Sequence, residues 1–286
     1  MKNIRLMTIL ACLLSACSAE SLAGPAVSKN ELCVVSFNVR SDIDGKFSDG
    51  DNSWCYRQDA SDAMIKDIRP DVCGMQEVRP HQLYDLEEAL PNYRFIGVGR
   101  DDGVNKGERM MVMFNIKTVK LLDWGTYWLS ETPDIPSKGW DAAYPRTATW
   151  AKFRHTPSGK EFFFVNTHLD HRGAQAKKNG LLLIWDRIAQ MNPEGLPLIL
   201  TGDFNVTPSD DALKILEGKM QSARVVAEDS DDKGSFNGFS DGPRKIIDYI
   251  YFSNFSRCKD FKVIDKTYKK VPYISDHYPI RTLLEF

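Results

Sequence analysis

The chain has 286 residues, of which 37 are basic and 39 are acidic, and its formal net charge is −2. Proteins that bind duplex nucleic acid usually carry a basic stripe, because neutralising phosphates supplies most of their non-specific affinity. Here the basic residues are scattered, which weighs against a duplex nuclease, while 42% hydrophobic and 11% aromatic residues are sufficient for a large, strand-rich core.

The N-terminus has the pattern of an export signal. Lys2 and Arg5 form a positive segment before a short apolar run from Leu6 to Leu14, and small residues follow the run. The run is shorter than the ~20 residues that a membrane-spanning helix needs. The segment Leu14-Ser15-Ala16-Cys17 resembles a bacterial lipobox, which implies cleavage before Cys17 and lipidation of its thiol.

The rest of the sequence predicts one domain. We expect a signal peptide at 1–16, a short tether at 17–30 and a single folded domain at 31–286, because no linker-like or repeated segment interrupts the sequence. The protein is then extracytoplasmic and attached to a bacterial membrane through its lipid, either in the periplasm or at the cell surface. Cleavage near residues 23–24 is the alternative, and it would give a secreted protein.

Helices and strands alternate along this domain. Helical periodicity predicts helices at 57–68, 80–90 and 174–190. Apolar runs predict strands at 34–38, 71–77, 93–98, 110–115, 118–124, 146–153, 161–167, 196–200 and 246–252. The two strands around Pro157-Ser158-Gly159 are expected to form a hairpin. The pattern indicates an α/β fold.

Two polar residues follow the apolar run at 196–200. Gly202 permits a sharp exit from the strand, so Asp203 and Asn205 are expected where the strand ends. Ligands bind beyond the carboxyl ends of strands in open α/β sheets. Taken alone, an Asx turn after a core strand explains the segment better.

The same arrangement recurs in five other apolar segments. They present Asn38, Glu77, His168, Asp248 and the pair Asp276-His277. A buried carboxylate is costly unless it is paired or bound to a cation. The repetition therefore predicts one site at which these side chains gather around a metal ion or a reacting group.

Six short motifs occur in a fixed order: Ser36-Phe37-Asn38, Gln76-Glu77, Asn166-Thr167-His168, Gly202-Asp203-Phe204-Asn205, Ile247-Asp248-Tyr249 and Ser275-Asp276-His277. Each is unspecific alone, but the ordered set resembles the endonuclease/exonuclease/phosphatase family of metal-dependent phosphoesterases. The resemblance extends from about residue 31 to residue 286. It implies a four-layer α/β/β/α sandwich of the DNase I type, with two packed mixed β-sheets flanked by helices.

The resemblance also implies a metal site. Glu77 is the expected metal ligand, with Asn38 and Asp276 in support, and Glu108 is a candidate ligand of a second metal or an indirect partner of the first. These oxygen ligands suit Mg²⁺, which prefers oxygen and retains several waters. Mn²⁺ is the expected substitute.

The catalytic residues follow from the same motifs. Asp248 is expected to orient His277, and in the family this pair either activates water or stabilises the transition state. Asp203 is the competing group for accepting a proton from water. Asn205 and His168 are expected to hydrogen-bond the phosphoryl oxygens as charge develops.

Substrate contacts are less constrained by the sequence. Three arginines near the motifs are candidate substrate-binding residues: Arg109, Arg146 and Arg172. Arg172 is equally well explained by capping and solvent pairing, Arg109 departs from the residue type expected there, and Arg146 is expected either to orient Asp203 or to line the pocket. Three aromatic residues would form a rim to the site unless they pack in the core: Trp128, Trp140 and Tyr144.

Four cysteines lie in the predicted domain: Cys33, Cys55, Cys73 and Cys258. If Asn38 and Glu77 both face the site, counting back along each strand places Cys33 and Cys73 on opposite faces of the sheet. We therefore expect buried thiols more than disulfides, with a bridge between Cys55 and Cys258 left open.

These observations predict an extracytoplasmic, magnesium-dependent phosphoester hydrolase. Its expected partners are a phosphoester substrate and, through the lipid anchor, a membrane; no obligate protein partner is inferred. Phosphodiester cleavage is favoured. The alternatives are a secreted nuclease acting on single strands, a phosphomonoesterase acting on sugar or inositol phosphates, and a non-catalytic relative that binds phosphorylated ligands.

Overall fold

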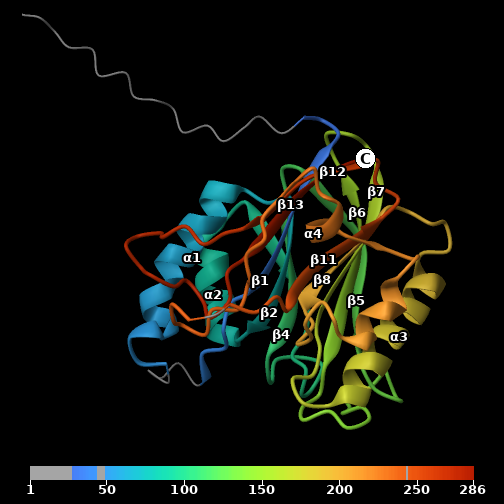
Figure 1. Cartoon of the computed structure of the whole chain (residues 1–286), viewed down its shortest axis with the longest axis horizontal. Helices are drawn as coiled ribbons and strands as arrows, with labels where there is room; N and C mark the ends of the chain where they lie inside the picture. Colours follow the sequence, from blue (N-terminus) through green and yellow to red (C-terminus); the bar gives the residue numbers. More distant parts are fainter. Residues whose placement is uncertain (1–27, 44–48, 243) are drawn as a thin grey trace, which may run out of the picture.

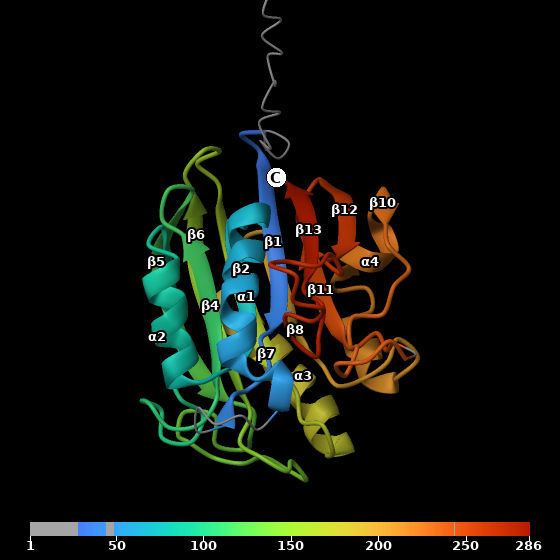
Figure 2. The same ribbon diagram turned by 90° about the vertical axis from the view of Figure 1, so that its left-hand side faces the viewer.

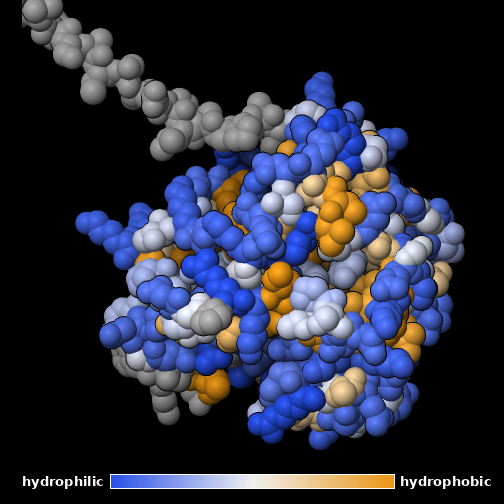
Figure 3. All heavy atoms as spheres, in the orientation of Figure 1, coloured by the Kyte–Doolittle hydropathy of each residue, from blue (hydrophilic) through white to orange (hydrophobic). Residues whose placement is uncertain are grey.

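The computed structural model describes residues 28–43, 49–242 and 244–286. The expected signal peptide and Cys17 lie outside the described residues. Within the described ranges, no helix combines the length and the apolar character needed to cross a membrane. On the face shown in Figure 3, apolar residues form small groups among hydrophilic ones.

The strands form two sheets. The seven-stranded sheet has the order β10-β12-β13-β1-β2-β4-β3, and the six-stranded sheet has the order β5-β6-β7-β8-β11-β9. The strands of the first sheet are β1 (Glu31–Asn38), β2 (Val72–Val78), β3 (Tyr93–Ile96), β4 (Arg109–Asn115), β10 (Asp229–Ser230), β12 (Arg257–Val263) and β13 (Ile280–Glu285). Those of the second are β5 (Val119–Trp128), β6 (Thr147–His155), β7 (Glu161–His168), β8 (Leu198–Asp203), β9 (Gln221–Ser222) and β11 (Asp248–Ser253).

The helices cover the outer faces of the two sheets. α1 (Trp54–Ile68) and α2 (Pro80–Ala89) lie on one side of the molecule and α3 (Ala174–Met191) on the other, with the strands between them (Figure 1). Seen from the side of α1, this helix lies in front of β1 and β2 (Figure 2). The shorter helical segments are α4 (Ala223–Val226), η2 (Gly50–Asn52) and η3 (Asp211–Leu216). This confirms the expected four-layer sandwich.

The predicted elements are all present, with shifted ends. α1 begins at Trp54 and ends where Arg69 adopts a left-handed conformation before Pro70, while Pro80 starts α2 at a position where its missing N–H is not needed. β5 continues through Trp128, further than its apolar run indicated. The expected hairpin is present as the antiparallel pair β6–β7.

The layer between the sheets changes in character along the strands. At one end, apolar side chains such as Val34, Val72 and Phe164 pack together. Two residues further along each strand, small or uncharged polar residues face the same layer: Ser36, Gly74, Asn166 and Thr201. Two residues further again come Asn38, Gln76, His168 and Asp203. Because side chains alternate between faces with a period of two, each strand contributes one residue to each tier.

Asn166 joins the two sheets in the middle tier. Its Nδ2 donates to the carbonyl oxygens of Met75 and Met111 in the opposite sheet, each at 2.9 Å. Its Oδ1 accepts from Gln76 Nε2 at 2.7 Å and from Thr201 Oγ1 at 3.1 Å. Every hydrogen-bonding position of this buried amide is therefore engaged, which favours a single arrangement of the sheets.

The structure corrects the expected positions of two cysteines. β1 and β2 pair in parallel with Val35 opposite Cys73, so Cys33 and Cys73 face the same side of the sheet. The count back from Glu77 failed because Glu77 has a left-handed backbone, with φ of 67°, next to a bulge in the pairing with β4. The four described cysteines are nevertheless free thiols, as expected, and Cys55 is the exposed one.

Substituting Gly74 tests the contact between the sheets. A Cβ atom at Gly74 would lie 2.1 Å from Thr201 Oγ1 and 2.5 Å from Asn166 Oδ1, so Gly74→Ala must push the sheets apart. We expect the free energy of unfolding in urea to fall by at least about 1–3 kcal/mol. Gly242→Ala is the control, because its Cβ would meet only Ser240 Oγ at 3.5 Å. Equal stability of the two variants would contradict the assigned packing.

Candidate active site

The polar ends of the strands meet in one cleft. Its volume is about 600 Å³, and its lining includes Glu77, His168, Asp203, Asp276 and His277. The carboxyl ends of β7 and β8 and the start of the antiparallel β11 lie at the same edge, with His168 opposite Asp203 and Asp203 opposite Asp248. The strand register thus places one reactive side chain from each of three neighbouring strands in a row.

Glu77 is held as a carboxylate. Its Oε1 accepts from Asn38 Nδ2 at 3.0 Å and its Oε2 from the backbone N–H of Ser41 at 2.7 Å. Burial opposes ionisation, but these two hydrogen bonds and the charges of His277 and Arg40 keep the pKa of Glu77 below its ordinary value. The left-handed backbone at Glu77 turns its side chain towards Asn38, which explains how a residue out of step with the alternation reaches the site.

Asp203 lies at the centre of the site. Its Oδ2 accepts from Asn38 Nδ2 at 3.1 Å and lies 3.4 Å from His168 Nε2 and 3.6 Å from His277 Nε2. Burial raises the pKa of Asp203 to about 7, with His277 acting in the opposite direction. A carboxyl group with this pKa can exchange a proton near neutral pH.

His277 lies between two carboxylates on adjacent strands. Its Nδ1 is 2.8 Å from Asp248 Oδ2, and its Nε2 faces Asp203. Burial alone would favour the neutral ring, but Asp248 and Asp203 raise the pKa of His277 well above its ordinary value. The positive ring also separates like charges that would otherwise repel across the strand pair.

His168 is a neutral histidine beside Asp203. Asn205 Nδ2 donates to the Leu169 carbonyl at 3.0 Å, which fixes the orientation of the amide, and it also contacts His168 Nε2 at 3.0 Å. Nε2 is then an acceptor and Nδ1 carries the proton. Burial and the charges of Arg146 and Arg100 lower the pKa of His168 well below its ordinary value.

The cleft has the ligands for a divalent cation. Ligand atoms of Glu77, His168 and Asp203 lie within 4.8 Å of one another, as do those of Asp203, Asp248 and His277. Burial raises the pKa of both Asp203 and Asp276, and the charge of Glu77 raises both further. A bound cation would relieve this repulsion, so the residues fit the expected metal.

Glu108 enters the cleft but is already paired. Its carboxylate forms an ion pair with Arg100 and lies 3.6 Å from Arg79 Nη2. Burial and the nearby charge of Glu77 raise its pKa. The geometry of Glu108 therefore fits a residue that acts on the metal indirectly better than it fits a metal ligand.

The three candidate arginines take different positions. Arg146 lines the cleft, where its Nε lies 3.3 Å from Asp170 Oδ2 rather than beside Asp203. Arg172 is exposed and does not line the cleft. Arg109 is buried on β4, where it donates to Asn105, so the structure does not bring it to the cleft. Its strand position directs it away from the side on which Glu108 points.

The three candidate aromatic residues also lie in different environments. Tyr144 lines the cleft and is 51% exposed. Trp128 is buried and donates from Nε1 to the Arg100 carbonyl, and Trp140 packs against the core beneath α3. One aromatic residue of the three is therefore positioned to meet a substrate.

Several cleft residues were missed in the sequence: Arg40, Arg79, Arg100, His171, Phe236 and Lys245. Arg40 and Arg79 each follow a motif residue by two positions, which is the one signal that would have indicated them. Arg40 forms a bidentate ion pair with Asp49 and lies 3.4 Å from Asp276. The other four come from loops whose course no local pattern determines.

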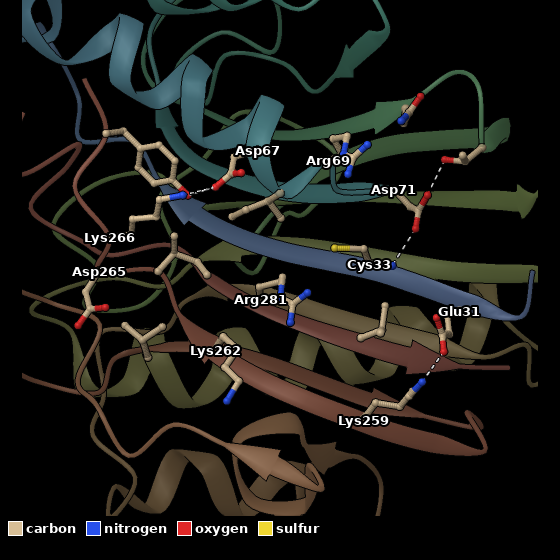
Figure 4. Close-up of a pocket in the computed structure, with 17 residues that line it drawn as sticks. Glu31, Cys33, Asp67, Arg69, Asp71, Lys259, Lys262, Asp265, Lys266 and Arg281 are labelled. Atoms are coloured by element: carbon tan, nitrogen blue, oxygen red, sulfur yellow. Dashed lines mark hydrogen bonds and ion pairs between the residues drawn. The ribbon is translucent and has the colours of Figure 1, made fainter. Parts of the chain in front are cut away.

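A second, larger hollow of about 720 Å³ lies at the opposite end of β1 (Figure 4). Its basic side chains are largely neutralised, since Lys259 pairs with Glu31, Lys266 with Asp67 and Arg281 with Asp260. The charged groups in this hollow thus hold the fold together, and the reactive side chains are in the smaller cleft.

Comparison with known proteins agrees with this geometry. The family model described as "Endonuclease/Exonuclease/phosphatase family" matches residues 35–277. The chain belongs to this family. Its members are hydrolases that act on phosphoester bonds and generally depend on divalent metal ions, so this chain is a phosphoesterase.

Two solved structures from Bacteroides thetaiotaomicron are similar over most of the chain. One is an endonuclease/exonuclease/phosphatase family protein with 35% identity and a TM-score of 0.85, covering 89% of this chain and 97% of its own. The other is a mannosyl-6-phosphatase with 35% identity and a TM-score of 0.84, covering 89% and 100%. The uncharacterized protein L388 of Acanthamoeba polyphaga mimivirus is 30% identical over 171 residues, which span 56% of this chain and 61% of that relative.

The pKa of His277 provides a direct test of the site. Asp248 stabilises the charged ring, so Asp248→Asn should shift the pKa of His277 downward, and the imidazolium should lose its proton at a lower pH. The measurement is NMR titration of the His277 ring in metal-free protein. Asp186→Asn on the exposed face of α3 is the control and should leave the titration unchanged. An unchanged His277 titration in Asp248→Asn would refute the pairing.

Proposed function

We propose that this phosphoesterase is a magnesium-dependent phosphomonoesterase that acts on phosphorylated sugars. The observation that carries the proposal is the charge of the cleft. Five basic residues (Arg40, Arg79, Arg100, Arg146 and Lys245) and four acidic ones (Glu77, Glu108, Asp203 and Asp276) line it. His277 adds a further positive charge, while Asp49, Asp170 and Asp248 pair with Arg40, Arg146 and His277 from outside the lining. A bound divalent cation would then leave the cleft net positive.

A positive cleft favours the more negative substrate. A phosphomonoester carries a charge of roughly −1.5 to −2 at neutral pH, as a phosphorylated side chain does, whereas a diester carries a single negative charge. The sequence alone favoured diesters, but it did not reveal that Arg79 and Arg100 join Arg146 in the cleft. The similarity to a mannosyl-6-phosphatase over 89% of the chain supports a sugar monoester.

The residues divide the hydrolysis between them. Glu77, with Asp276 in support, would hold the cation, and Asn38 positions the Glu77 carboxylate through its Nδ2. The cation would supply polarisation of the phosphoryl oxygens and offset their charge. Asp203 accepts a proton from the water that attacks phosphorus, the bond from phosphorus to the sugar oxygen breaks, and that oxygen takes a proton from solvent so that the sugar leaves as an alcohol. The His277 imidazolium, with Asn205 and His168, stabilises the charge on the phosphoryl oxygens.

Hydrolysis of matched substrates tests the proposal. We expect mannose 6-phosphate and p-nitrophenyl phosphate to be hydrolysed faster than bis-p-nitrophenyl phosphate, and EDTA to abolish release until Mg²⁺ or Mn²⁺ is restored. Faster release from the diester would instead support a phosphodiesterase, and no release from any of them would contradict the proposal.

His277→Ala should lower turnover at least about a hundredfold with unchanged circular dichroism, and Glu77→Gln should raise the Mg²⁺ concentration needed for half-maximal activity.

We also propose that the protein is a lipid-anchored extracytoplasmic enzyme, on the basis of the lipobox-like segment that ends at Cys17. In a bacterial host, Cys17→Ser should transfer the protein from the membrane fraction to the soluble fraction. Identical fractionation of the variant and the wild type would exclude the anchor.

A further inference from the structure

Resting on the proposed phosphomonoesterase function, we propose that Tyr144, Arg146 and His171 form the subsite that recognises the hydroxyl groups of the sugar. They lie on the loops before β6 and after β7, and all three line the cleft. We call these three residues the leaving-group wall.

Asp170 fixes the two loops to each other. Its Oδ2 accepts from the backbone N–H groups of Ala143 at 3.0 Å and Tyr144 at 3.4 Å, and from Arg146 Nε at 3.3 Å. Its Oδ1 accepts from the backbone N–H groups of Arg172 and Gly173. The Asp170 side chain is fully buried, so one carboxylate positions the whole wall before any substrate arrives.

Arg146 determines which proton His171 carries. Arg146 Nη2 lies 3.2 Å from His171 Nδ1, and a guanidinium can only donate, so Nδ1 must accept. Burial and the charge of Arg146 lower the pKa of His171, which keeps the ring neutral with its proton on Nε2. Within the described ranges no acceptor pairs with this Nε2–H, so it is available to a ligand in the cleft.

Arg146 has a second unused donor. Its Nη1 is buried without a hydrogen-bond partner among the described residues, although the side chain is only 5% exposed. A buried donor left unpaired destabilises the free protein. A ligand oxygen placed beside Arg146 would remove this cost, which points to an acceptor on the substrate.

Tyr144 supplies a flat apolar surface beside these donors. Its ring is stacked with His171 at a centroid distance of 5.9 Å and an interplanar angle of 22°, and the guanidinium of Arg100 lies 5.1 Å from its centroid. Half of the residue remains exposed. An apolar face bordered by a few fixed donors fits the carbon face and hydroxyl oxygens of a sugar.

The charges favour hydroxyl groups over a second anion. Asp170 neutralises Arg146, and Glu108 neutralises Arg100, so the wall has little net charge of its own. Arg146 and His171 line the same cleft as His168, and the charge of Arg146 lowers the pKa of His168, which places the wall next to the phosphoryl contacts. The wall is therefore suited to the group that leaves rather than to the phosphate.

The test compares kcat/KM for mannose 6-phosphate and for p-nitrophenyl phosphate, which has no sugar hydroxyls. His171→Phe retains the stacking ring and removes the Nε2–H. The kcat/KM for mannose 6-phosphate divided by that for p-nitrophenyl phosphate should therefore fall at least about tenfold, mainly because KM for mannose 6-phosphate rises. Tyr144→Ala should lower the same ratio, whereas Tyr144→Phe, which keeps the aromatic ring, should retain the wild-type ratio. Tyr84→Ala on α2, where Tyr84 is 67% exposed, is the matched control and should leave the ratio unchanged.

The outcomes separate this proposal from the proposed function. If wild type hydrolyses both monoesters and His171→Phe leaves their ratio unchanged, the wall is not the sugar subsite, while the phosphomonoesterase function stands. If wild type hydrolyses neither, the function itself fails. If a nucleoside 5′-monophosphate is preferred and Tyr144→Ala removes that preference, the wall stacks a base, which overturns the sugar assignment.

Discussion

The site depends on two sheets keeping one register, because its parts are divided between them. Asn38 and Glu77 come from the seven-stranded sheet, whereas His168, Asp203 and Asp248 come from the six-stranded sheet. Apolar packing is not directional and would tolerate a small slide between the layers. The fully hydrogen-bonded Asn166 amide prevents such a slide, because it joins β7 directly to backbone carbonyls of β2 and β4. The hydrogen bond from Asn38 Nδ2 to Asp203 Oδ2 then connects the sheets again one tier further along.

This tiered arrangement also explains how the fold tolerates so many buried charges. The charged tier lies at the end of the strands, beside the cleft, and the uncharged polar tier separates it from the apolar core. Within the charged tier, like charges are interleaved with unlike ones, as where His277 lies between Asp203 and Asp248. Burial and the remaining repulsion from the charge of Glu77 raise the pKa values of Asp203 and Asp276. The repulsion that would destabilise the free protein is what gives a cation its affinity.

The sequence predicted the strands, the helices and the side chains that the strands deliver, because a buried strand ending on a polar residue is a local pattern. It did not predict the face of Glu77, since one left-handed residue at a bulge breaks the alternation on which the count depends. Arg109 was expected at the site and lies outside it, while Arg100 was overlooked and lies inside. Strand alternation directs Arg109 away from the side on which Glu108 points. The position of Arg100 depends instead on a loop whose course is set by tertiary contacts, such as the hydrogen bond from Trp128 Nε1 to the Arg100 carbonyl.

The residues that carry out the chemistry and those that select the substrate come from different parts of the fold. The groups that handle the phosphate and the cation occupy strand ends, where the register fixes their distances to one another. The leaving-group wall lies on loops that are joined through Asp170. A change in these loops alters what stands beside the scissile bond without moving Asp203 or His277. One phosphoryl-transfer centre can therefore accept different leaving groups, and selectivity should follow the loops around Asp170 more closely than the six motifs by which the chain was first assigned.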